Sequence, residues 1–177
     1  MIGRLSRALV HEVKRGLCLR EMGEYTFRVS RFGAYRFICG NRVEFHRTVE
    51  YGNEAAALGA FLFLLRPDDV VWDIGASVGL YSIHAAGVAK AVVAIEPDQA
   101  TFTRLRQNIE LNSLANRISC STEALGETAG EGQLRTDGLG GNAPALADLG
   151  RHADVTSVKV TTIDHLLESG SQVPTVL

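Results

Sequence analysis

The segment VVWDIGASVG, residues 70–79, constrains the fold of this chain more than any other part of the sequence. It starts as an apolar run typical of a buried strand and ends in a turn with Gly75 and Gly79, after which helical spacing begins at Leu80. A turn from strand to helix brings backbone N–H groups close to a ligand, and glycine permits that approach because it has no side chain. The segment therefore predicts an α/β fold with a ligand site at the carboxyl end of this strand.

The sequence that follows continues the alternation of strand and helix. We expect strands at residues 70–76, 91–97 and 118–122, helices at 80–86 and 99–112, a later strand at 158–160 and a helix from 164. Such an alternation is typical of a parallel sheet with right-handed crossovers. The longest apolar run, residues 55–65, predicts a buried helix. Its 11 residues are fewer than the about 20 that a membrane span needs, so no transmembrane segment is expected.

Residues 1–50 differ from the rest in pattern and charge. Apolar residues at helical spacing among basic ones predict an amphipathic helix at 2–15, which we expect to pack against the domain rather than on a membrane or a polyanion. Alternating runs at 25–29, 35–37 and 43–45 predict two or three antiparallel strands. This part holds ten Lys and Arg against five Asp and Glu, and the remainder holds eight against fifteen. We therefore expect a basic, β-rich extension attracted to an acidic domain at residues 51–177.

Two segments predict departures from a complete domain. Residues 126–150 contain seven glycines and almost no periodicity, which indicates an insertion: either a mobile flap near the substrate or a disordered surface segment. Residues 173–177 look like the first residues of a buried strand with nothing after it. We therefore expect a domain that is truncated at its carboxyl end.

Composition and cysteine spacing narrow the class of protein. With 46% hydrophobic and 21% charged residues, the chain is typical of soluble globular proteins, which excludes wholesale disorder. Cys18, Cys39 and Cys120 lack any C-x-x-C spacing, so neither a disulfide framework nor a zinc site is indicated and no metal is expected. A reducing cytoplasm is the expected location.

Three ligand classes compete for the turn at residues 75–79. A dinucleotide fingerprint would need glycine where Ser77 and Leu80 stand, and a P-loop would need a lysine that is absent. The pattern G-x-S-x-G also matches the nucleophile elbow of α/β-hydrolases, with Ser77 as nucleophile. Because no earlier strand of the sheet precedes residue 70 to supply an oxyanion loop, the hydrolase stays a remote alternative. Its acid and histidine would have to come from the region of Asp154, Asp164 and His165.

The end of the second strand favours a nucleoside ligand. Glu96 stands at its tip, 21 residues beyond Gly75, where a carboxylate can accept hydrogen bonds from both hydroxyls of a ribose. Asp73 ends the first strand at the same edge of the sheet, where it can accept hydrogen bonds or offset a cation.

Four motifs in one order extend this interpretation. DIGASVGLYSIHAA, AIEPDQATFTRLRQNIELN, EALG and VTTIDHLL together resemble the FkbM-type methyltransferases over residues 51–177. The resemblance implies a Rossmann-like parallel sheet of the class I methyltransferase type, here partial and with the β-rich extension, and S-adenosyl-L-methionine as cofactor. Members of that family usually have Asn at the position of Ser77. In that family a segment like residues 173–177 leads into a strand with an acidic K-I-D-V-E-G type motif, which pairs with the strand that carries Asp73. That strand is absent here, so we expect the apolar strand of Asp73 to have an open edge.

The resemblance assigns roles by position. The turn residues border the methionine part of the cofactor, Glu96 holds the ribose with two neighbours that shape that edge, and the residues after the third strand lie beside the adenine. The implied cofactor-binding residues are Asp73, Gly75, Ala76, Ser77, Gly79, Glu96, Pro97, Asp98, Glu123 and Ala124. Tyr81 and Ser82 are either further contacts or ordinary residues of a first helical turn.

The resemblance also implies an activity: O-methylation, in which a hydroxyl on a sugar or polyketide-like small molecule attacks the methyl group in line. Nucleic acid is not expected as a partner, and an oligomer or a completing chain is an open option. No catalytic base is named, because His84 and His165 qualify only by chemical type. The alternative function is that of a non-catalytic or incomplete cofactor-binding fragment.

Overall fold

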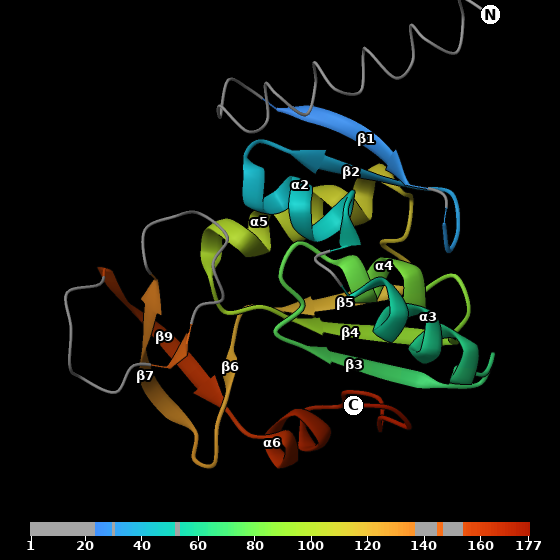
Figure 1. Cartoon of the computed structure of the whole chain (residues 1–177). Coiled ribbons are helices and arrows are strands. Elements are labelled where there is room, and N and C mark those ends of the chain that lie inside the picture. Colours follow the sequence, from blue (N-terminus) through green and yellow to red (C-terminus); the bar gives the residue numbers. More distant parts are fainter. Residues whose placement is uncertain (1–23, 30, 52–53, 137–144, 147–153) are drawn as a thin grey trace, which may run out of the picture.

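A computed structural model describes residues 24–29, 31–51, 54–136, 145–146 and 154–177. Its central sheet has three parallel strands in the order β3-β4-β5, formed by Val70–Ile74, Ala91–Ile95 and Ile118–Ser121. The helices α4 (Leu80–Ala85) and α5 (Gln99–Leu111) connect these strands in turn (Figure 1). The predicted α/β fold with a parallel sheet is thereby confirmed.

The crossover helix α5 shows why this part of the chain folds as predicted. The Asp98 side chain caps it by accepting a hydrogen bond from the Thr101 backbone N–H at 2.8 Å. Its apolar stripe buries Leu105 and Ile109 in the main hydrophobic cluster. Asn108, fully buried on the same helix, donates to the Val78 carbonyl and accepts from the Ile38 backbone N–H. The helix therefore contacts both the ligand turn and the N-terminal segment.

The N-terminal segment forms an antiparallel hairpin, β1 (Tyr25–Val29) with β2 (Tyr35–Cys39), followed by a helix, α2 (Arg42–Thr48). The two predicted strands are confirmed, but the third, at residues 43–45, is wrong because that stretch is helical. The Asn41 side chain accepts from the Glu44 backbone N–H, and the Glu44 carboxylate accepts from the Gly40 backbone N–H. This reciprocal cap starts a helix, and two alternating apolar residues are too few to oppose it.

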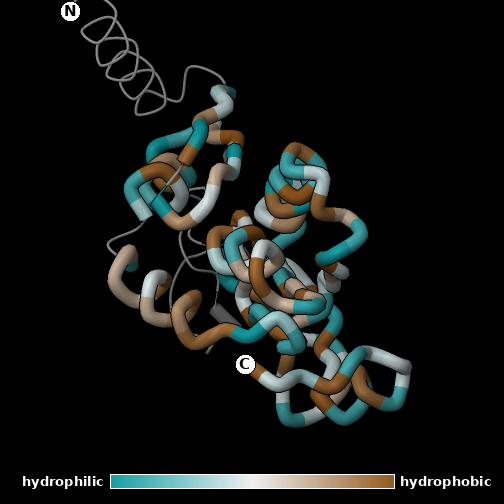
Figure 2. Tube along the Cα trace, turned by 90° about the vertical axis from the view of Figure 1, so that its right-hand side faces the viewer, coloured by the Kyte–Doolittle hydropathy of each residue, from teal (hydrophilic) through white to brown (hydrophobic). Residues whose placement is uncertain are grey.

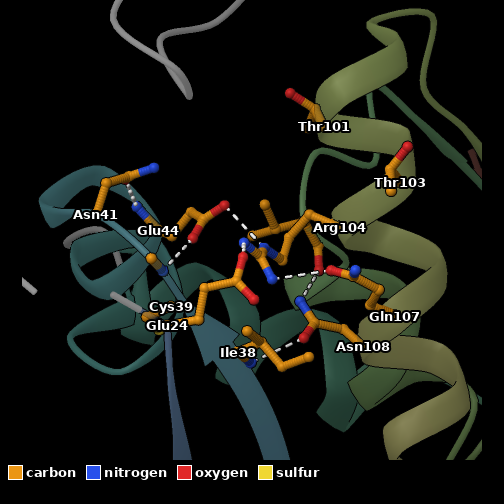
Figure 3. Close-up of polar contacts among 12 residues, drawn as sticks. Glu24, Ile38, Cys39, Asn41, Glu44, Thr101, Thr103, Arg104, Gln107 and Asn108 are labelled. Atoms are coloured by element: carbon orange, nitrogen blue, oxygen red, sulfur yellow. Dashed lines mark hydrogen bonds and ion pairs between the residues drawn. The ribbon is translucent and has the colours of Figure 1, made fainter. Parts of the chain in front are cut away.

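Ion pairs and hydrogen bonds fasten this segment to α5, as Figure 3 shows. The Arg104 guanidinium contacts the Glu44 carboxylate at 2.9 Å and also pairs with Glu24. Phe37 of β2 is fully buried in the same hydrophobic cluster as Leu105 of α5. The hairpin and the α/β part therefore share one core. The predicted basic helix at 2–15 lies outside the described residues.

The apolar helix α3 (Ala55–Leu64) is less buried than predicted. Leu58 is fully buried, whereas the side chains of Phe63 and Leu64 are 88% and 73% exposed. Figure 2 shows hydrophobic colours over most of the helix, but only one side of it packs against α4, through contacts such as Phe61 with Tyr81. The prediction of a buried helix is therefore wrong for its outer side. Within the described residues, no helix is both long and apolar enough to cross a membrane.

A second sheet has the order β6-β9-β7-β8, formed by Ala124–Leu125, Asp154–Thr161, Gly130–Thr136 and Ala145–Leu146. The predicted insertion without regular structure is wrong for β7, which pairs antiparallel with β9 along seven residues. Glycines do not prevent such a ladder because its bonds join backbone groups, and Leu134 anchors β7 in a small apolar cluster. The predicted strand at 158–160 is confirmed within β9. Residues 137–144 and 147–150 of the predicted insertion lie outside the described residues.

The last residues return to the central sheet. Helix α6 (Ile163–Glu168) begins after Thr162, whose side chain accepts from the His165 backbone N–H. Val176 then lies parallel to Val71, and its carbonyl accepts from the Trp72 backbone N–H at 2.9 Å. This segment pairs with the edge of β3 at Val71 and Trp72, so the expectation that the strand of Asp73 has an open edge is wrong there.

Candidate cofactor-binding site

A cavity of about 620 Å³ opens at the carboxyl ends of β3 and β4. In Figure 1 these ends point toward the second sheet, so both sheets contribute to its wall. The cavity is lined by Arg47, Glu54, Asp73, Ile74, Gly75, Ala76, Ser77, Val78, Leu80, Tyr81, Ile95, Glu96, Pro97, Ala124, Leu125 and Leu134. Seven of the ten predicted cofactor-binding residues are in this set; Gly79, Asp98 and Glu123 are not.

The two glycines of the turn have different surroundings. The backbone N–H groups of Gly75 and Ala76 both donate to the Ile95 carbonyl, which fixes the turn to the end of β4. Gly75 has a φ of +77°, and a Cβ placed there would meet no atom within 4 Å. Gly79 has a φ of +95°, and a Cβ placed there would lie 2.8 Å from Leu105 Cδ1. Gly75 thus leaves space at the cavity, whereas Gly79 permits close packing of α4 on α5.

Glu96 carries the most constrained carboxylate at the cavity. Its side chain is buried, and its oxygens accept hydrogen bonds from the backbone N–H groups of Ser77 at 2.8 Å and Asp98 at 3.0 Å. Burial raises the pKa of this carboxyl, while the two N–H donors oppose that rise. A carboxylate oxygen has more than one lone pair. Both oxygens can therefore accept a further hydrogen bond from a ligand diol.

Asp73 lines the cavity beside the turn and is held by Ser82. The Ser82 hydroxyl donates to the Asp73 carboxylate at 2.5 Å, and Ser82 itself is fully buried and does not line the cavity. Burial raises the pKa of Asp73, and the Ser82 bonds oppose the rise. The structure thus assigns Ser82 a supporting contact behind Asp73.

Tyr81 lines the cavity at the first turn of α4. Burial and the neighbouring Glu54 carboxylate, which accepts from its hydroxyl, raise the pKa of Tyr81 to about 12. The phenol is therefore protonated at neutral pH and acts as a hydrogen-bond donor.

Arg47 is a site residue that the sequence reasoning missed. It projects from α2 and its Nη1 donates to the Ser77 Oγ at 2.7 Å. Among the described residues that line the cavity, it is the only cation. The signal that could have found it is the cap at Asn41, because a helix that starts there carries Arg47 on its last turn.

The remaining predicted residues shape the edge of the cavity. Pro97 and Ala124 line it, together with Leu125 of β6 and Leu134 of β7. Asp98 is occupied as the cap of α5, and Glu123 pairs with Lys159 of β9. The apolar stretch of wall suits a flat ring better than a charged group.

Neither candidate histidine faces the cavity. His84 is buried among aromatic rings, with Tyr35 at 4.9 Å between ring centroids, and its Nδ1 contacts the Leu80 carbonyl. Burial lowers the pKa of His84. His165 lies on α6 and does not line the cavity.

The hydrolase alternative requires a base beside Ser77, and the structure places a guanidinium there instead. No histidine lines the described part of the cavity, so a Ser-His pair is absent from it. Groups of three or more His, Cys, Asp or Glu able to hold a metal ion do not occur within the described ranges.

Comparisons with known proteins give the class of this domain. Residues 48–134 match the family model described as the TRM5/TYW2 methyltransferase domain. The ribosomal protein L11 methyltransferase of Thermoanaerobacter sp. is 33% identical over 72 residues, which are 40% of this chain and 23% of that protein. The tRNA(Phe) (4-demethylwyosine(37)-C(7)) aminocarboxypropyltransferase of Pyrococcus horikoshii is 44% identical over 55 residues, 30% of this chain and 20% of that protein.

Among solved structures, a complex of aTrm5 with tRNALeu is 24% identical with a TM-score of 0.46, covering 56% of this chain and 28% of that one. The aligned part of this chain spans about a quarter of the curated relatives or less. The predicted class, an S-adenosyl-L-methionine-dependent methyltransferase domain of class I, is confirmed by the family match.

Two expectations are corrected by these matches. The matched family is TRM5/TYW2 and not FkbM. The resemblance to FkbM rested on the glycine turn and the acidic strand end, and class I domains in general share these features. The expectation that nucleic acid is not a partner is contradicted, since the chain matches the TRM5/TYW2 family model and a relative whose name identifies it as a tRNA-modifying enzyme. Cofactor motifs describe the donor and say nothing about the acceptor, which explains both errors.

Proposed function

We propose that this chain binds S-adenosyl-L-methionine in the cavity and transfers its methyl group to an RNA nucleotide, with tRNA as the acceptor class. The geometry of Glu96 supports the proposed cofactor binding. Its buried carboxylate is fixed by two backbone N–H groups at the end of β4 and borders a cavity large enough for a nucleoside.

The residues around Glu96 fit the remaining parts of the cofactor. The apolar wall of Pro97, Ala124, Leu125 and Leu134 would hold the adenine, and Glu96 would accept hydrogen bonds from the ribose hydroxyls. The turn at residues 75–77 and Asp73 would hold the methionine end. Gly79, Asp98 and Glu123 act indirectly, by holding the turn, the start of α5 and the end of β5 in place.

The relatives and the surface charge support the proposed acceptor class. Exposed arginines gather on the N-terminal segment: Arg28, Arg31, Arg36 and Arg42. Arg28 and Arg36 stand directly opposite each other in the hairpin, an arrangement of like charges that an isolated hairpin disfavours. The described glutamates of this segment are engaged, Glu24 and Glu44 with Arg104 and Glu50 with His46. A surplus of exposed arginine favours binding of a phosphate backbone.

When bound, the cofactor supplies an electrophilic methyl group on a sulfonium. The chain's own residues bind it, orient it and present polar groups to the acceptor. Tyr81 and Glu54 both line the cavity and form a hydrogen-bonded pair there. The phenol donates its one proton to Glu54, so its oxygen and the carboxylate both position the acceptor nucleotide by accepting hydrogen bonds from it.

The test is transfer of tritium from methyl-labelled S-adenosyl-L-methionine to three acceptors offered separately: an unmodified tRNA transcript, a ribosomal RNA fragment and ribosomal protein. The proposal expects label in the tRNA transcript. Label confined to ribosomal protein, or to no acceptor with a chain that binds the cofactor, would overturn the RNA assignment and leave the cofactor assignment in place.

A further inference from the structure

We infer that Arg47 binds the α-carboxylate at the methionine end of the cofactor, so that the N-terminal segment completes the cofactor site. This inference rests on the proposed function, because it takes the cavity to hold S-adenosyl-L-methionine. It assigns a ligand contact to a part of the chain that lies before the α/β elements.

The charges around the cavity support a carboxylate contact at Arg47. Its described lining contains Glu54, Asp73 and Glu96 as carboxylates and Arg47 as the one cation. The cofactor presents hydroxyl donors, an ammonium and a sulfonium, which the carboxylates suit, and a single carboxylate, which they repel. A guanidinium offers several N–H donors in a planar fork that matches a carboxylate. Arg47 is therefore the described group whose charge fits the cofactor carboxylate.

The position of Arg47 also supports this contact. Its Nη1 contacts the Ser77 Oγ, while the backbone N–H of the same serine contacts Glu96. Ser77 of the turn thus contacts both the Arg47 guanidinium and the Glu96 carboxylate. The arginine is close enough to Glu96 for its charge to oppose the rise in the pKa of that carboxyl. Arg47 therefore lies at the turn that borders the methionine end and not at the apolar adenine wall.

The anchoring of α2 supports this contact as well. Glu44, one turn before Arg47 on this helix, is buried and paired with Arg104 of α5 (Figure 3). Helix α5 begins directly after its capping residue Asp98, whose backbone N–H donates to the Glu96 carboxylate. The helix that carries Arg47 is thus fixed to the helix that follows the ribose site. Such anchoring gives a binding residue a defined position before the ligand arrives.

Calorimetric titration with two ligands tests the inference: S-adenosyl-L-methionine and its decarboxylated analogue, which keeps the adenosine and the sulfonium. The wild-type chain is expected to bind the complete cofactor about 10- to 100-fold more tightly, the range for one charge-assisted contact. Arg47→Met is expected to bind both ligands equally and weakly. Arg42→Met, at an exposed arginine of the same helix, is expected to keep the wild-type preference.

The outcomes separate the inference from the proposed function. Arg47→Met with an undiminished preference, or wild-type chain with no preference, would overturn the assignment of Arg47 while cofactor binding stands. A folded wild-type chain that binds neither ligand would overturn the proposed function itself. Arg47→Lys covers the case in which Arg47→Met does not fold: it keeps the charge without the planar fork, and is expected to show a reduced but measurable preference.

Discussion

Ser77 connects the parts of the candidate site at the scale of single residues. Its backbone N–H holds Glu96, its hydroxyl accepts from Arg47, and its φ of +52° places it in the left-handed region. The sequence predicted Asp73, Ser77 and Glu96 at one edge of the sheet, because parallel strands bring their carboxyl ends together. It could not predict Arg47, since a contact between residues 30 positions apart depends on how α2 docks.

The two turn glycines are expected to respond differently to alanine. Gly75→Ala introduces about 1 kcal/mol of backbone strain and places a methyl group at the cavity, so cofactor affinity falls more than stability. Gly79→Ala adds a clash with Leu105 to similar strain and is expected to cost about 2 kcal/mol of unfolding free energy. Urea denaturation and cofactor titration of both variants measure this. If Gly75→Ala lost more stability and Gly79→Ala lost more cofactor affinity, the assignment of Gly75 to the cavity and of Gly79 to helix packing would be contradicted.

Cofactor affinity is expected to fall with decreasing pH because of Glu96. Its pKa is raised above the ordinary 4.5, so the carboxylate takes up a proton while an exposed glutamate is still ionised. The protonated form accepts fewer hydrogen bonds from the ribose, and affinity is lost as the pH falls through the raised pKa. Titrations from neutral pH down toward 4.5 check this. Glu96→Gln should show a weaker pH dependence; an unchanged dependence would assign the effect to another group, such as Asp73.

At the scale of elements, long periodic segments were predictable and short or capped ones were not. Helix α5 has an apolar residue on each turn and a capping Asp98, and its bounds agree with the prediction within one residue. Helix α2 has only seven residues, and its identity depends on the cap at Asn41. Strand β7 is rich in glycine and polar residues, so its partner β9 defines it more than its own pattern does.

Because Arg104 joins α5 to α2, we expect its replacement to destabilise the fold much more than replacement of Arg106 on the same helix. Arg104→Met leaves the buried Glu44 carboxylate without its cation and is expected to cost about 3 kcal/mol of unfolding free energy. Arg106→Met removes an exposed pair with Glu110 and is expected to cost less than about 1 kcal/mol. The midpoints of urea denaturation measure the two losses, provided that the unfolding free energy of both variants depends equally steeply on urea concentration. Equal losses would show that the pairing of α2 with α5 contributes little to stability.

At the scale of the whole molecule, individual ion pairs explain the attachment of the N-terminal segment to the α/β part better than the overall division of charge does. The sequence suggested attraction between a basic extension and an acidic domain. The described ion pairs that join the two parts have the opposite polarity, since Glu24 and Glu44 come from the basic part and Arg104 from the acidic one. Pairing of these glutamates leaves the surplus arginines of the extension facing solvent. That surplus is the surface feature that agrees with a nucleic-acid acceptor.

Calorimetric titration of S-adenosyl-L-methionine into the chain measures cofactor binding at Glu96 most directly. We expect saturable binding at one site, weakened about 10- to 100-fold by Glu96→Gln, because a hydrogen-bond acceptor with full charge is lost. Glu127→Gln, at an exposed glutamate of the same chain, should bind as the wild type does. A folded wild-type chain that does not bind the cofactor, or a Glu96→Gln variant with unchanged affinity, would contradict the account.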